Sequence, residues 1–132
     1  MNDTLMDDFI DTANALLIRN RSILDTISKF QITAAKVSRA VVKCATHCGC
    51  IEIDAKKQDY SNEDASLEDL RESMDTHIQG ELCPRCREII ARELGEHLFY
   101  LASICNSLDL DYTEIIEKEN QRMSTLGVFN LR

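Results

Sequence analysis

The sequence lacks tryptophan and has few of the residues that interrupt helices. Its 132 residues include one proline and four glycines, and aromatic residues make up 5% of the chain. Many short strands joined by tight turns would need more proline and glycine than this, so the composition favours long helices. We therefore expect an all-α fold, an antiparallel helical bundle that forms a single domain over residues 1–132.

The chain also lacks long apolar runs and an excess of positive charge. No run approaches the roughly 20 apolar residues of a membrane span, and the first residues, MNDTLMDDFIDTANALL, are acidic where a secretory leader is basic. Because 15 Lys and Arg stand against 23 Asp and Glu, the formal net charge is -8, which disfavours nucleic acid and anionic membranes as partners. We expect a cytoplasmic protein that binds neither nucleic acid nor membrane.

Apolar residues repeat at helical spacing along most of the chain. The pattern predicts helices over about residues 4–18, 22–48, 67–78, 84–108 and 109–123. The stripe of the second helix contains Ile27, Ala34, Val37 and Val41, and the segment KFQIT interrupts its pattern. Residues 55–65 are polar without an apolar period and are expected to form a mobile loop, whereas 124–132 form a tail.

Four of the six cysteines form two closely spaced pairs. Cys48 and Cys50 flank a glycine in THCGC, and Cys83 and Cys86 form the C-x-x-C pair of ELCPRCRE. Two such pairs from separate segments can supply the two edges of a thiolate tetrahedron, which is the geometry of a structural Zn²⁺ site. The spacing predicts a zinc site that pins the segment inserted between the second and third long helices.

The residues around each pair suit this site. Gly49 permits a sharp turn between the first two cysteines. Pro84 favours the first position of a helix, which would place Cys83 at the N-cap and Cys86 in the first turn, where free amides stabilise thiolates. Neighbouring arginines, Arg85 and Arg87, would offset the negative charge of a zinc ion bound by four thiolates.

Several alternatives stay open for these groups. His47 either replaces one cysteine as a ligand or hydrogen-bonds a thiolate, or it is a surface histidine at a helix end. Cys44 and Cys105 lie on helical stripes and are expected in the core. Four thiolates also bind iron or an iron-sulfur cluster, and CPRC alone is compatible with a thiol redox protein, although no β-α-β pattern precedes it.

The segment ELGEHLFYLASICNSLDLDYTEIIEKENQR, residues 93–122, resembles the C-terminal half of the MazG-like all-α nucleoside triphosphate pyrophosphohydrolases. In that family, two acidic pairs on antiparallel helices hold Mg²⁺ against the triphosphate, and Glu93 and Glu96 stand at the positions of the second pair. Residues 41–58, VVKCATHCGCIEIDAKKQ, are similar to the preceding family helix, but His47 and Cys50 stand where the first acidic pair would be.

The resemblance implies a MazG-like helical scaffold that packs as a homodimer. Because Mg²⁺ prefers oxygen ligands, the exchange of two carboxylates for imidazole and thiolate favours a noncatalytic binding or regulatory domain over an enzyme. The alternative implied by the resemblance is a divergent pyrophosphohydrolase that binds a nucleotide and uses Glu93 and Glu96 with Mg²⁺. The phosphates of the nucleotide would then be bound by three residues of the last helix, Lys118, Asn120 and Arg122.

Overall fold

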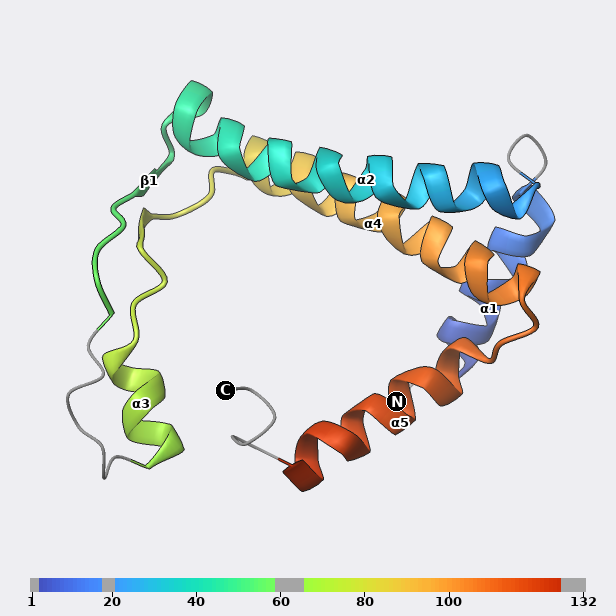
Figure 1. The fold of residues 1–132 in the computed structure, drawn as a ribbon. Coiled ribbons are helices and arrows are strands. Elements are labelled where there is room, and N and C mark those ends of the chain that lie inside the picture. Colours follow the sequence, from blue (N-terminus) through green and yellow to red (C-terminus); the bar gives the residue numbers. More distant parts are fainter. Residues whose placement is uncertain (1–2, 18–20, 59–65, 127–132) are drawn as a thin grey trace.

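The computed structural model describes residues 3–17, 21–58 and 66–126. Two long helices, α2 (Ile23–Lys43) and α4 (Pro84–Ser107), lie side by side, and the other elements extend from the two ends of this pair (Figure 1). The helices are antiparallel, because Thr33 of α2 contacts His97 of α4, whereas Lys36 contacts the earlier residue Glu93. The expected mostly helical, all-α fold is confirmed, and α2 continues through KFQIT without a break.

One end of the α2–α4 pair is closed by α1 (Asp3–Leu16) and the start of α5 (Tyr112–Leu126). The buried residues of this apolar end are Ala13, Ala102, Cys105 and Tyr112, and Met6, Phe9, Ile10, Phe99 and Leu101 pack against them. Asn106 links the helices here by donating a hydrogen bond from Nδ2 to the carbonyl oxygen of Ile10, at 3.2 Å. From this end, α5 turns back below the helix pair and diverges from α4 (Figure 1).

The other end carries a short antiparallel pair of strands, β1 (Ile51–Ile53) and β2 (Ile78–Gly80). Between the strands, the chain leaves the helix pair, forms α3 (Leu67–Ser73) and returns (Figure 1). The helix predicted over residues 67–78 is therefore too long: it ends at Ser73, and its last residue belongs to β2. The strands were missed because three residues each are too few for a periodic signal.

The expected loop over residues 55–65 and the expected tail over residues 124–132 lie partly outside the described residues. Residues 59–65 of the expected loop and 127–132 of the expected tail lie outside them, whereas 124–126 belong to α5. Among the described residues, no helix is long and apolar enough to cross a membrane.

The contact between α2 and α4 buries small polar residues instead of the predicted apolar stripe. Thr26 and Thr33 are 0% and 1% exposed, whereas Ile27 and Val41 are 41% and 37% exposed. The Thr33 hydroxyl lies 2.8 Å from His97 Nδ1, and the His97 ring stacks on Phe30 with ring centres 4.5 Å apart. The residues of α2 that face α4 thus come one position before most residues of the predicted stripe. The stripe therefore lies at the side of the contact and stays partly exposed.

Candidate metal centre

The first cysteine pair lies where α2 ends. Residues Cys44–Cys48 continue the helix as one π-helical turn, η1, in which each hydrogen bond spans five residues and not four. Gly49 ends this turn with φ 81°, and its N–H donates to the carbonyl oxygen of Cys44 at 2.8 Å. Since a left-handed residue reverses the chain at once, Cys48 and Cys50 point into the same space before β1 begins.

The second pair lies at the start of α4, as the sequence predicts. Cys83 is the N-cap and Pro84 follows it at the first helical positions. The backbone N–H of Cys86 donates to the Cys83 sulfur at 3.4 Å, and the N–H of Arg87 donates to the Cys83 carbonyl oxygen at 2.9 Å. The cap therefore fixes the position of the Cys83 side chain relative to the first turn.

The strand pair brings the two cysteine pairs together. Ile51, next to Cys50, lies opposite Gly80, three residues before Cys83. Gly80 has φ 87°, and a Cβ atom there would lie 2.7 Å from the carbonyl oxygen of Cys50. Only glycine permits this close approach, so Gly80 positions the site without providing a ligand. This role of Gly80 was not predicted, because the close approach joins two segments that lie far apart in the sequence.

The four sulfur atoms form one compact group. The Sγ atoms of Cys48, Cys50, Cys83 and Cys86 all lie within 4.8 Å of one another, and those of Cys48 and Cys83 are 3.8 Å apart. A zinc ion with Zn–S bonds of about 2.3 Å holds its sulfurs about 3.8 Å apart at the corners of a tetrahedron. The four predicted cysteines thus lie close enough to hold one metal ion, and all six cysteines of the chain are free of disulfides.

Hydrogen bonds and burial give the two thiols of the second pair, Cys83 and Cys86, different pKa values. The backbone N–H and then the thiol of Cys86 donate to the Cys83 sulfur and lower the pKa of Cys83 to about 7. The hydrogen bond of Cys86 with the Cys44 thiol, and then burial, raise the pKa of Cys86 well above the usual thiol range. Cys83 is therefore the most readily ionised of this pair, and a dication would favour the thiolate form of both.

Basic side chains line a cavity of about 350 Å³ beside the sulfurs. Its wall includes Lys43, His47 and Arg85, together with Cys48 and Cys86. His47 is not among the four groups whose ligand atoms converge, so the structure places it at the edge of the centre. A zinc ion bound by four thiolates would carry two net negative charges, which the side chains of Lys43 and Arg85 in the wall of this cavity would partly offset.

The sulfur group rests on a small core of its own. Cys44, Ile51 and Cys86 are buried there, and Ala45, Leu82 and Ile90 pack against them with Cys50 and Cys83. Cys44 lies directly beneath the site, since its carbonyl oxygen accepts a weak hydrogen bond from the Cys50 thiol at 3.9 Å. Cys105 is buried at the opposite, apolar end. Both cysteines expected in the core are therefore buried.

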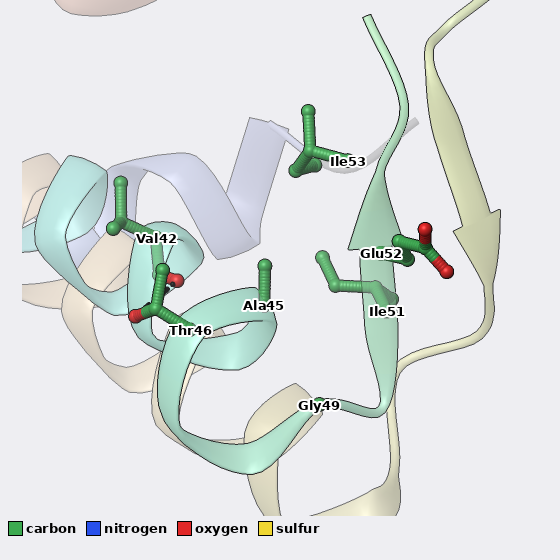
Figure 2. A pocket seen from close by; sticks show the side chains of 7 residues that line it. All are labelled: Val42, Ala45, Thr46, Gly49, Ile51, Glu52 and Ile53. Carbon is green, nitrogen blue, oxygen red and sulfur yellow. Dashed lines mark hydrogen bonds between the residues drawn. The ribbon is translucent and has the colours of Figure 1, made fainter.

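A second hollow opens between η1 and β1, with a volume of about 520 Å³. Figure 2 shows Val42, Ala45 and Thr46 on the helical side and Ile51, Glu52 and Ile53 on the strand side, with Gly49 between them. The lining is mostly aliphatic and has one ionisable group, Glu52. This hollow therefore lacks the paired acid and base or nucleophile that catalysis would need.

The acidic pair of α4 faces a cation. Lys36 of α2 forms ion pairs with Glu93 at 3.5 Å and with Glu96 at 3.1 Å, and these contacts, the hydrogen bond to Glu96 first, raise the pKa of Lys36. In the described residues, the four cysteines form the single group of potential ligands that is close enough for a metal ion. The position opposite Glu93 and Glu96 is thus occupied by an ammonium group, where a Mg²⁺ site would need more carboxylates.

The candidate phosphate-binding residues lie on α5 and pair within that helix. Lys118 contacts Glu114 at 2.8 Å, and Arg122 forms an ion pair with Glu119. The carbonyl oxygen of Asn120 accepts a hydrogen bond from the Ser124 hydroxyl at 2.8 Å. These ion pairs stay within α5, whereas Glu93 and Glu96 pair with Lys36 of α2.

Comparison with models of protein families, with curated protein sequences and with solved structures gives no match to this chain. The MazG-like resemblance therefore stays a prediction, and the function has to be argued from the site.

Proposed function

We propose that this chain is a noncatalytic binding or regulatory domain whose four cysteines hold one structural Zn²⁺ ion. The observation that carries the proposal is the convergence of four Sγ atoms from two segments within 4.8 Å. Four protein ligands complete a tetrahedron and leave no position for water or substrate, which is the arrangement of a structural zinc site. Because reduced thiols persist in reducing compartments, a cytoplasmic location fits this role.

The ion would stabilise the end of the molecule where the core is smallest. It would connect the η1–β1 turn to the start of α4, which otherwise meet through a few buried side chains and the three-residue strands. The coordination energy would then contribute to folding, as it does in small zinc domains. The reduced mobility of this end would give a partner a fixed surface to bind.

A single ion suits the sulfur spacing better than an iron-sulfur cluster. A cluster attaches its cysteines to different iron atoms and needs wider spacing, whereas 3.8 Å between Cys48 and Cys83 is about the edge of a tetrahedron around one ion. One tetrahedral iron ion would fit the same spacing, and it differs from zinc in colour.

Metal analysis of protein purified without chelator tests the proposal. We expect close to one zinc per chain, and loss of the metal in Cys50→Ser and in Cys83→Ser. Cys105→Ala is the matched control, because Cys105 is a buried cysteine outside the centre and its variant should keep the metal. Folded, metal-free parent protein, or zinc that survives both serine substitutions, would overturn the proposal.

The MazG-like resemblance fits this function as a scaffold that has lost its catalytic metal site. The contacts of Lys36 with Glu93 and Glu96 support that view over a divergent Mg²⁺-dependent pyrophosphohydrolase. We expect no Mg²⁺-dependent release of pyrophosphate from any nucleoside triphosphate. Release that is lost in Glu93→Gln, with zinc still bound, would establish the enzyme instead and leave the metal site intact.

A thiol redox protein is the other alternative, and the lowered pKa of Cys83 beside the buried Cys86 favours it. In such a protein, the pair would cycle between dithiol and disulfide, and Cys48 and Cys50 would be dispensable. Mass spectrometry after exposure to oxidised glutathione distinguishes the two. Zinc bound through all four sulfurs should prevent formation of the Cys83–Cys86 disulfide until a chelator is added.

A further inference from the structure

Strand β1 pairs with β2 along one edge, and in the described part of the chain no strand lies along its other edge. The ladder continues one residue past β1, where the Asp54 N–H donates to the His77 carbonyl oxygen at 2.8 Å. In an antiparallel pair, alternate residues direct their main-chain groups toward the partner strand. Because Asp54 does so, Ile53 and Ala55 direct their N–H and carbonyl groups away from β2. Among the described residues, no group forms a hydrogen bond with them.

The hollow of about 520 Å³ lies along this free edge. Its lining includes three residues of β1 and none of β2. Figure 2 shows β1 between the hollow and β2, with the side chains of Ile51 and Ile53 directed toward the helical wall. Ile51 is buried, whereas Ile53 and Val42 are 51% and 55% exposed. An aliphatic side chain from a neighbouring strand would therefore contact an aliphatic surface here.

The other face of β1 is acidic. Side chains alternate between the two faces of a strand, so Glu52 and Asp54 share the face opposite the two isoleucines. Both carboxylates are exposed, and within the described ranges neither forms an ion pair. Lys56, two residues further on, pairs with Asp75 at 3.6 Å. A strand beside β1 would thus meet aliphatic side chains on one face and unpaired carboxylates on the other.

We propose that the free edge of β1 binds an extended segment of a partner protein in which aliphatic residues alternate with lysine or arginine. The segment adds to the sheet as a third strand, and its main chain pairs with Ile53 and Ala55. Its aliphatic side chains enter the hollow, and its basic side chains face Glu52 and Asp54. Main-chain pairing supplies affinity in this mode of binding, whereas the alternating side chains supply specificity.

Charge selects a basic segment over a second copy of this chain. A second copy that paired through its own β1 would bring the carboxylates of Glu52 and Asp54 from both copies onto one face, where like charges repel. The net charge of -8 adds to this repulsion, and it attracts a basic segment before contact. The inference rests on the proposed binding function, because it names the class of partner that the domain would bind.

Fluorescence anisotropy on the full chain tests the edge. The probe is a labelled peptide in which valine alternates with lysine, and the matched probe has the same composition with the lysines grouped at one end. We expect the alternating peptide to bind at least about tenfold more tightly. The N–H groups of the valines face one edge of the added strand and those of the lysines face the other. N-methylation of one of these two sets, but not of the other, should therefore abolish binding.

Reversal of charge on β1 tests the specificity. Glu52→Lys combined with Asp54→Lys should abolish binding of the alternating lysine peptide and create binding of a peptide in which valine alternates with glutamate. Asp8→Lys combined with Glu117→Lys is the matched control, because it changes the net charge equally at exposed residues of α1 and α5. This control should keep the preference of the parent chain.

The proposal fails if the parent binds no alternating peptide, as expected where a second copy occupies the edge, or binds the grouped peptide equally well. It fails also if the charge-reversed chain still prefers lysine. If charge reversal prevents folding, Glu52→Gln combined with Asp54→Asn decides, since loss of both charges should weaken binding at least about tenfold. Metal analysis of the same samples separates the two proposals: a folded parent without zinc that binds the alternating peptide would overturn the metal site and support the edge.

Discussion

The two ends of the α2–α4 pair are closed in different ways. At the apolar end, α1 and the start of α5 cover Ala102 and Cys105 with aliphatic and aromatic side chains. At the metal end, two of the three buried residues of the core are cysteines, and four sulfurs converge above it. One helix hairpin can thus be closed by ordinary burial at one end and, as we propose, by metal coordination at the other.

Removal of the metal should produce the largest difference in stability between the two ends. Structural zinc contributes about 10–16 kcal/mol of apparent binding free energy in zinc-finger peptides. With chelator, we expect hydrogen exchange to become fast in η1, β1, β2 and the first turn of α4, while amides near Ala102 keep their protection. Equal loss of protection at both ends would show that the ends are not independent.

The glycines of the metal end test how closely the strands must approach. A left-handed non-glycine residue costs about 1–2 kcal/mol, and this cost alone should apply to Gly49→Ala, since a Cβ there meets nothing within 4 Å. Gly80→Ala has the same strain and also a clash with the Cys50 carbonyl oxygen at 2.7 Å. We expect a larger loss of unfolding free energy and weaker zinc binding for Gly80→Ala. Equal effects of the two substitutions would contradict the role of Gly80.

A substitution at the apolar end should reduce stability without affecting metal binding. Ala102 is 0% exposed, so Ala102→Leu overfills the cluster and should lower the free energy of unfolding by about 1–3 kcal/mol. Zinc content should stay that of the parent, because the substitution lies at the other end of α4. Chemical denaturation together with metal analysis measures both, and loss of zinc in this variant would count against separate ends.

The smallest effect is expected at the base of the excursion that carries α3. Asp75 accepts a hydrogen bond from the His77 N–H at 2.9 Å and forms an ion pair with Lys56 at 3.6 Å, and its pKa is lowered chiefly by the His77 N–H. A lowered folded-state pKa stabilises the fold above the unfolded pKa of a carboxyl group, and this contribution is lost as pH falls through the lowered value. Asp75→Asn should slightly reduce stability at neutral pH and flatten its acid dependence, with zinc content unchanged.

The features that follow from local sequence were predicted well. Ser66 and Asp69, three residues apart, have the spacing that predicts a capping box at the start of a helix. The box is present, since the Asp69 N–H donates to Ser66 Oγ at 3.1 Å and the Asp69 carboxylate accepts from the Ser66 N–H. The start of α4 at Pro84 with Cys83 as its cap was also predicted. Both depend on a few neighbouring residues whose hydrogen bonds are made within one turn.

The features that depend on distant parts of the chain were not predictable in the same way. The register of Ile51 with Gly80 joins segments far apart in the sequence, and the π-helical turn appears only where α2 meets the strands. The cysteine spacing indicated one shared site, but not that Cys44 lies beneath it. The stripe through Ile27 and Val41 indicated a helix, but it did not indicate that these two side chains stay exposed while Thr26 and Thr33 are buried.

The antiparallel strands have a consequence for the evolution and engineering of this chain. Because Ile53 lies opposite Ile78, the excursion leaves and re-enters the molecule at one place, and α3 stands apart from the helix pair (Figure 1). A segment whose two ends meet can be exchanged, lengthened or replaced without changing the path of the chain on either side. The strand pair is thus a site at which loops or small domains can be inserted. Such insertions can add new binding surfaces without moving the helices.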